Sequence, residues 1–99
     1  MGLANVLAAV QSGITRFDGS LGGLGGCPYA PGASGNISSE DAIYMLDAMG
    51  YETGIDVPRL IHLARELPLI VGHPVPGQIA KAGSTCDLHP APDYVDELR

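Results

Sequence analysis

The sequence predicts an α/β fold, because it combines helical patterns with a strand pattern. Only one strand is predicted, so the chain is expected to be a segment of such a fold and not a whole one. Apolar residues recur at helical spacing in three separate stretches, and one short stretch alternates apolar with polar side chains. A glycine-rich loop follows the alternating stretch. A lone strand leaves both of its edges unpaired. We therefore expect the order helix, strand, Gly-rich loop, helix, helix, within an incomplete sheet.

The first predicted helix covers residues 2–12, and the predicted strand follows it directly. The apolar positions of the helix are Leu3, Val6, Leu7 and Val10. Gly13 is a typical stop signal, because glycine adopts the left-handed backbone that ends helices. From Ile14 to Ser20 the chain alternates apolar and polar residues around Phe17, which predicts an extended strand.

The second predicted helix covers residues 39–49. Ser38 or Ser39 can cap its N-terminus, and the carboxylates of Glu40 and Asp41 favour the positive end of the helix dipole. Its apolar face is predicted to hold Ile43, Leu46 and Met49, and Gly50 closes it.

The third predicted helix begins after Asp56, which serves as its cap, with Pro58 in the first turn. Its apolar stripe is predicted to be Leu60, Leu63, Ala64 and Leu67. Pro68 is expected to end or kink this helix. A short helical turn is predicted at 77–82. We expect one domain over residues 1–83 and a disordered tail over 84–99.

The composition excludes several classes of partner. The chain has 99 residues and a formal net charge of −6, and its five basic residues form no patch. This charge argues against nucleic acid and against an anionic membrane surface. No apolar run is long enough to span a bilayer, and no secretory signal is recognised. Cys27 and Cys86 are expected to be free thiols in a reducing compartment, with a bridge between them as the alternative.

The glycine-rich stretch GGLGGCPYAPGASGN, residues 22–36, holds the candidate chemistry. It can be a simple turn with a packing cysteine, and it lacks the lysine and Ser/Thr of a phosphate-binding loop. However, loops that follow strands carry the active sites of α/β barrels. A thiol fixed by Pro28 is suited to general acid–base catalysis, and Asn36 offers an oxygen that Mg²⁺ accepts.

The stretch SLGGLGGCPYAPGASGNISSEDAIYML resembles the signature segment of the 3-hydroxy-3-methylglutaryl-CoA lyase family. Ser20 to Tyr29 fill the family signature, in which Leu21 and Gly22 replace the usual Val-Ala pair. The resemblance continues through ETGID and covers residues 1–83. It implies that the chain is the C-terminal part of a TIM barrel.

The resemblance also implies an activity, the cleavage of 3-hydroxy-3-methylglutaryl-CoA into acetyl-CoA and acetoacetate. In that family a divalent metal, Mg²⁺ or Mn²⁺, holds the substrate oxygens. A base removes the hydroxyl proton, the carbon–carbon bond breaks, and the acetyl-CoA enolate takes up a proton. Carried over by position, Cys27 delivers that proton and Asn36 is a metal ligand. Glu40 matches an acid beside the site, or is simply a helix N-terminal carboxylate.

The same resemblance implies a loop that closes over the acyl-CoA thioester. Its residues are Gly22, Gly23, Gly25, Gly26, Pro28 and Tyr29. The implied compartment is the bacterial cytoplasm or the mitochondrial matrix, and a homo-oligomer is compatible with the sequence.

The chain departs from the family by lacking its other metal ligands. The family's His-x-His-Asp motif and its aspartate and arginine on the first strand are missing, and His62, His73 and His89 form no such pair. A TIM barrel takes about 250 residues. We therefore expect Met1 to be an internal methionine of a longer reading frame, and activity of the isolated chain to be absent. The alternative is a truncated, non-catalytic fragment or interaction module that retains the loop.

Overall fold

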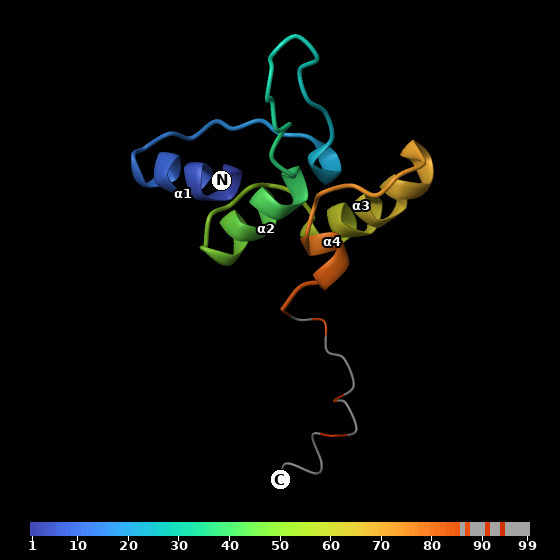
Figure 1. The fold of residues 1–99 in the computed structure, drawn as a ribbon. Helices are drawn as coiled ribbons and strands as arrows, with labels where there is room; N and C mark the ends of the chain where they lie inside the picture. The colour runs from blue at the N-terminus through green and yellow to red at the C-terminus, as the bar shows by residue number, and fades with distance from the viewer. Residues whose placement is uncertain (86, 88–90, 92–93, 95–99) are drawn as a thin grey trace.

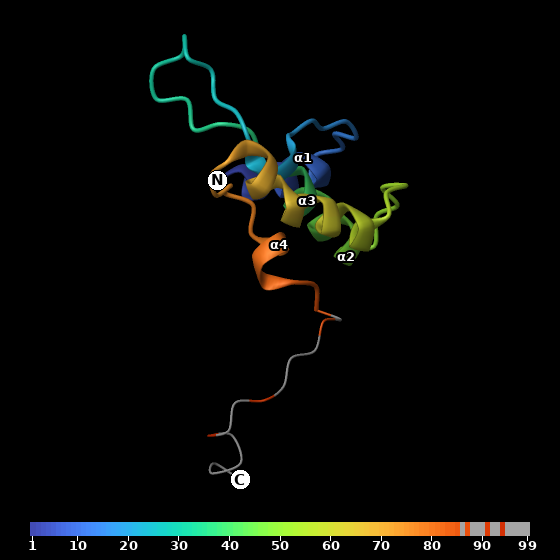
Figure 2. The same ribbon diagram turned by 90° about the vertical axis from the view of Figure 1, so that its right-hand side faces the viewer.

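The computed structural model describes residues 1–85, 87, 91 and 94. Its elements are α1 (Gly2–Gln11), the 3-10 helix η1 (Leu21–Gly23), α2 (Ser39–Ala48), α3 (Val57–Val71) and α4 (Ile79–Ala82). Figure 1 shows α2 between α1 and α3, and it shows the loop that follows η1 projecting away from the helices. The loop stands clear of the helices in the view of Figure 2 as well.

Helix α2 is the central element, because α1, α3, α4 and η1 all pack against it. The buried apolar side chains of the described residues are Val6, Ala42, Ile61, Ala64, Leu67, Val75 and Ile79. They come from α1, α2, α3, α4 and the segment before α4. This core is small, and it draws side chains from helices on both sides of α2.

The predicted N-terminal capping residues of α2 and α3 are confirmed. Ser38 accepts a hydrogen bond from the backbone N–H of Asp41 (3.3 Å) and caps α2. Asp56 accepts one from the N–H of Arg59 (3.2 Å) and caps α3. These side-chain acceptors satisfy backbone donors that have no partner within the helix, which explains why α2 and α3 begin where the sequence predicts.

The predicted strand from Ile14 to Ser20 is wrong. Its only β pairing among the described residues is an isolated parallel bridge between Ser20 and Ser38. Ser20 N–H donates to Ile37 O (3.1 Å), and Ser39 N–H donates to Ser20 O (2.9 Å). A strand needs the backbone groups of a neighbouring strand along its length. The described residues offer it a neighbour only at this bridge.

Two predictions about α3 are also corrected. The helix continues through Pro68 to Val71 and ends at Gly72, whose φ of 79° is left-handed. Its buried positions are Ile61, Ala64 and Leu67, whereas Leu63 is exposed. The predicted stripe is therefore rotated, because α3 turns the face centred on Ala64 toward α2 and η1. Met49, predicted on the apolar face of the second helix, follows the end of α2 as its C-cap and is likewise exposed.

The segment after α3 returns across α2 and is fixed there by polar contacts. The Asp41 carboxylate accepts hydrogen bonds from the N–H groups of Gln78 (2.9 and 3.1 Å) and Ile79 (2.7 Å). These bonds satisfy backbone donors at the start of α4, which confirms the predicted helical turn. Further on, Thr85 N–H donates to the Tyr44 hydroxyl (2.8 Å).

The predicted disordered tail, residues 84–99, lies largely outside the described residues, so the boundary at residue 83 stays a prediction. Within the part of the chain that the structure describes, no helix has the length and apolar character needed to cross a membrane.

Two leucines of α3, two positions apart in the sequence, test the position of the core. Leu67 is 9% exposed and Leu69 is 88% exposed. We expect Leu67→Ala to lower the free energy of unfolding by about 2–4 kcal/mol, because it removes buried methyl groups and leaves a cavity. The matched control Leu69→Ala should change it by less than about 0.5 kcal/mol. Urea unfolding followed by circular dichroism measures both, and equal effects would contradict this core.

Candidate functional site

The candidate site is the projecting loop between η1 and α2, which Figure 1 shows at the top of the molecule. Cys27 is exposed and starts a turn in which its carbonyl accepts the N–H of Ala30 (3.3 Å). Tyr29, in the same turn, is 92% exposed. The loop therefore exposes the Cys27 thiol and the Tyr29 phenol to solvent, where a bound molecule can contact them.

The two limbs of the loop meet at a narrow neck. A Cβ atom on Gly35 would lie 2.4 Å from the carbonyl oxygen of Gly25, which no side chain could tolerate. The φ of Gly35 is +96°, a conformation that glycine adopts without strain. Beside this crossing the Asn36 side-chain N–H donates to the carbonyl of Leu24 (2.9 Å). The neck thus closes the loop by backbone contact and by one side-chain hydrogen bond.

Asn36 is oriented by that hydrogen bond. Its amide nitrogen is engaged by Leu24, so its Oδ1 oxygen is the atom left to accept a donor or a cation. A hollow of about 450 Å³ opens beside it, between the start of α1, the neck and Pro76. The arrangement offers one neutral oxygen at the edge of an open space.

The base of the loop is held by a buried carboxyl group. Glu40 is 1% exposed, and its two oxygens accept the N–H of Gly22 at 2.8 and 2.9 Å. The Ser38 hydroxyl also donates to one of these oxygens (2.5 Å). On the other side, Gly77 N–H donates to the carbonyl of Gly22 (2.9 Å). Gly22 is therefore held on both of its backbone groups.

This geometry bears on the two interpretations of Glu40. Glu40 lies in the first turn of α2, as a helix N-terminal carboxylate does. Its hydrogen bonds, however, go to η1 and to Ser38. The carboxyl group connects α2 to the base of the loop, and it lies away from the exposed Cys27 turn.

The predicted loop residues divide into two groups. Gly22 and Gly23 are buried at the base in η1, and the remaining four, Gly25, Gly26, Pro28 and Tyr29, are exposed on the loop itself. Cys27 and Asn36 belong to opposite limbs of the same loop. Gly77 was not predicted as part of the site, and no local pattern in the sequence connects it to a glycine so far away along the chain.

The described residues do not by themselves fit a complete metal site. Asn36 supplies one amide oxygen, and no three His, Cys, Asp or Glu side chains among the described residues gather where they could hold an ion. His62 faces Glu66 on the exposed surface of α3 (3.5 Å), and the ring of His73 contacts the carbonyl of Pro74 (2.8 Å). A proposed bridge from Cys27 to Cys86 lies outside the described residues.

Two glycines of the loop test the neck. Gly35 and Gly32 both have positive φ, but a Cβ on Gly32 would meet nothing within 4 Å. Both alanine substitutions carry a backbone cost of about 1–2 kcal/mol. Only Gly35→Ala should also push the limbs apart and break the Asn36–Leu24 hydrogen bond. Side-chain amide NMR signals of Asn36 report this, and an unchanged Asn36 signal in Gly35→Ala would disprove the neck.

Comparison with known proteins gives a consistent result. A family model described as HMGL-like matches residues 1–67. The chain is 50% identical over 76 residues to a hydroxymethylglutaryl-CoA lyase of Bacillus subtilis, covering 77% of this chain and 25% of the relative. It is 49% identical over 82 residues to an (R)-citramalyl-CoA lyase of Chloroflexus aurantiacus, covering 83% and 26%.

A solved structure shows the same arrangement. The structure of an HMG-CoA lyase from Acinetobacter baumannii, in complex with coenzyme A and 3-methylmalate, matches with a TM-score of 0.88 and 58% identity. The match covers 92% of this chain and 30% of that chain. The present chain thus spans about a quarter of the length of the curated relatives it matches. It belongs to the HMGL-like family of TIM-barrel lyases, of whose barrel it forms an incomplete part.

Proposed function

We propose that this chain supplies the proton-donating loop of a carbon–carbon lyase that cleaves 3-hydroxy-3-methylglutaryl-CoA into acetyl-CoA and acetoacetate. The observation that carries the proposal is the exposed Cys27 thiol, on a projecting loop whose base is fixed by buried hydrogen bonds. The loop falls within the residues that the family model matches. Relatives and a structural neighbour are named as lyases of CoA thioesters.

The proposed step is a proton transfer from sulfur to carbon. When the carbon–carbon bond of the substrate breaks, its electron pair remains on acetyl-CoA as an enolate. The Cys27 thiol gives its proton to that carbon, and the resulting thiolate is protonated again from solvent. A general acid must come within hydrogen-bonding reach of the atom it protonates. The exposed position of Cys27 supports this role for a substrate bound against the loop.

The exposed part of the loop supports contact with a large thioester. Gly25 and Gly26 carry no side chains and leave the backbone accessible, and Tyr29 presents an exposed ring. The buried Gly22 and Gly23 act in the base, where Glu40 fixes the loop's direction. In this proposal Glu40 is a positioning residue that acts through Gly22.

A divalent metal, as the family resemblance implies, would hold and polarise the substrate oxygens when bound. Asn36 is proposed as one of its ligands, through Oδ1. The remaining ligands are proposed to come from the part of the barrel that the relatives have and the described residues lack. No step of the proton transfer above depends on the position of the ion.

A second substrate is favoured by one finding. The citramalyl-CoA lyase of Chloroflexus aurantiacus is about as similar to this chain as the Bacillus subtilis lyase, at 49% against 50% identity. The experiments below therefore use 3-hydroxy-3-methylglutaryl-CoA and citramalyl-CoA side by side. A chain that is only a non-catalytic remnant would support cleavage of neither.

Replacing Cys27 tests the proton transfer in a complete barrel. In a chimera, residues 1–83 of this chain replace the matching segment of the Bacillus subtilis relative. We expect Cys27→Ser to lower kcat by about 10²–10⁴-fold with little change in KM, because a hydroxyl is a far weaker acid than a thiol. Glu66→Gln, on the exposed surface of α3, is the control. A kcat for Cys27→Ser within about twofold of the parent would show that the thiol is not the acid.

Asn36 can be tested with a matched pair of substitutions in the same chimera. Asn36→Ala and Asn36→Asp both remove the donor to Leu24, but only Asp keeps an oxygen ligand. We expect Ala to raise the Mg²⁺ or Mn²⁺ concentration for half-maximal activity by at least about tenfold, and Asp to raise it less. If both substitutions raised this metal concentration equally, Asn36 would act only by closing the neck and not as a metal ligand. The isolated 99-residue chain should bind neither ion measurably in calorimetry at millimolar metal.

Glu40→Gln tests the positioning of the loop base. A glutamine offers one acceptor oxygen where Gly22 N–H and the Ser38 hydroxyl now use two. We expect the free energy of unfolding of the chain to fall by about 1–3 kcal/mol. The Gly22 amide should exchange faster with solvent, and kcat of the chimera should fall more than KM changes. An unchanged Gly22 exchange rate would argue against this role.

A further inference from the structure

The Leu24 carbonyl is the point at which side chains join the two limbs of the loop. Its oxygen accepts one hydrogen bond from the hydroxyl of Ser20, before the loop, and another from the side-chain amide of Asn36 (2.9 Å), at its end. A carbonyl oxygen has two lone pairs, so these two donors use its full capacity. Ser20 opens the stretch that resembles the family signature, yet the proposed chemistry gives it no role.

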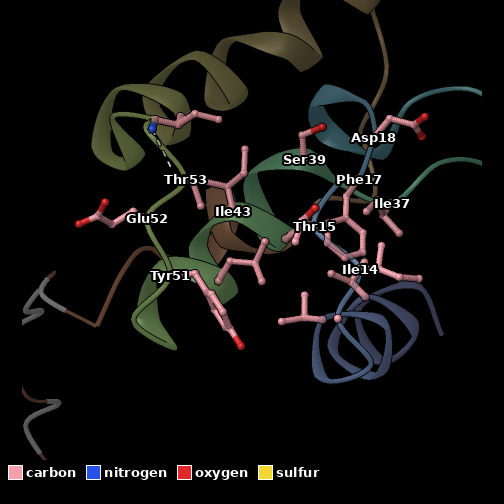
Figure 3. Close-up of a pocket in the computed structure, with 17 residues that line it drawn as sticks. Ile14, Thr15, Phe17, Asp18, Ile37, Ser39, Ile43, Tyr51, Glu52 and Thr53 are labelled. Carbon is pink, nitrogen blue, oxygen red and sulfur yellow. Dashed lines mark hydrogen bonds between the residues drawn. The ribbon is translucent and has the colours of Figure 1, made fainter.

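Ser20 is held in place by its own backbone. Its N–H donates to the carbonyl of Ile37 (3.1 Å), and its carbonyl accepts the N–H groups of Gly23 (3.0 Å) and Ser39 (2.9 Å). Figure 3 shows Ile37 and Ser39 in the same close-up as Phe17, which belongs to the segment that leads to Ser20. Ser20 itself is half-buried. Its hydroxyl therefore starts from a fixed position at the base of the loop.

The peptide group that carries the Leu24 carbonyl has more freedom to rotate. It joins Leu24 to Gly25, whose φ is +99°, and Gly23 on the other side of Leu24 has a φ of +75°. Glycine has no Cβ atom and adopts many backbone conformations, so this peptide group can rotate at little steric cost. Such a rotation would turn the carbonyl away from Asn36. The Ser20 hydroxyl opposes it, because a rotated carbonyl could no longer accept the hydroxyl proton.

The orientation of Asn36 depends in turn on this carbonyl. The Asn36 side chain is exposed, and its Nδ2 group donates to the Leu24 oxygen. A Cβ atom on Gly25 would lie 2.8 Å from Asn36 Nδ2, so the amide nitrogen also rests against the glycine of the same peptide group. Both contacts fix the nitrogen end of the side chain. They leave Oδ1 as the free atom beside the hollow between the start of α1 and Pro76.

We propose that Ser20 is a positioning residue for Asn36, because its hydroxyl fixes the Leu24 carbonyl and this carbonyl fixes the direction of Asn36 Oδ1. Where it concerns a metal, the inference rests on the proposed function, in which Asn36 is a ligand. Mg²⁺ demands nearly ideal octahedral geometry, so the direction of each ligand oxygen matters. An oxygen that is already held in place also loses less conformational entropy on binding. Ser20 should therefore raise the affinity for the ion without touching the ion or the substrate.

The first test measures the exchange of side-chain amide protons by NMR in the 99-residue chain without metal. The Asn36 amide should exchange more slowly than that of Asn5, an exposed side chain with no hydrogen bond among the described residues. Ser20→Ala should raise the Asn36 exchange rate by about twofold to tenfold, the factor that one hydrogen bond contributes. Ser20→Thr should keep the parent rate, because it retains the hydroxyl and suits the extended backbone here (φ −132°, ψ 150°).

Ser12→Ala is the matched control for this exchange measurement. It removes a hydroxyl that also donates to a backbone carbonyl, that of Ala8 (2.9 Å), but at the end of α1. It should leave the Asn36 exchange rate unchanged. Equal Asn36 exchange in the parent chain and in Ser20→Ala would overturn the proposal. So would an Asn36 amide that exchanges as fast as Asn5 in the parent chain, a result that requires no substitution to fold.

The second test uses the chimera and separates this inference from the proposed function. Ser20→Ala should weaken Mn²⁺ binding in calorimetry by about twofold to tenfold, while kcat at saturating metal stays within about twofold of the parent. In an Asn36→Ala background, Ser20→Ala should have no further effect on Mn²⁺ affinity, because the serine acts through Asn36. A further loss in that background would overturn the inference. Faster Asn36 exchange with unchanged Mn²⁺ affinity in both single alanine variants would support the positioning by Ser20 and count against Asn36 as a ligand.

Discussion

The structure depends on one buried interaction, the hydrogen bonds from Gly22 N–H and Ser38 Oγ–H to the Glu40 carboxyl group. Removing a carboxyl group from water is costly unless donors replace its hydration. Here a backbone donor and a hydroxyl do so at 1% exposure. The interaction ties η1 to α2, and through Gly77 it ties both to the segment before α4. The direction in which the loop leaves the helices follows from this junction.

The same junction explains why a glycine occupies position 22. A Cβ atom there would lie 2.7 Å from Leu67 Cδ2 and about 3.0 Å from Val75 Cγ2. The core therefore packs directly onto the backbone of η1, and Leu67 of α3 packs against the base of the loop. Core and candidate site are continuous here.

Local signals predicted the helices well, because caps such as Ser38 and Asp56 act on neighbouring residues. The predicted strand failed because strand formation depends on a partner, and the sequence of one strand does not show whether a partner is present. The loop residues were recognisable from their signature. The contact of Glu40 with Gly22 was not, because it joins positions 18 residues apart through tertiary packing. Pro68 does not end α3, because the other contacts of this helix outweigh the one backbone hydrogen bond that proline cannot donate.

The hydrogen bond between Gly77 and Gly22 has a consequence for synthesis on the ribosome. Gly77 follows Glu40 by 37 positions, so at ordinary elongation rates it is added about two to seven seconds later. Until then the Gly22 carbonyl has no Gly77 N–H to bind, and the segment that packs beside the Glu40 carboxyl group is missing. The hydrogen bond that holds the Gly22 carbonyl therefore cannot form before Gly77 has been added. Translation order makes the base of the loop one of the last parts of the molecule to form.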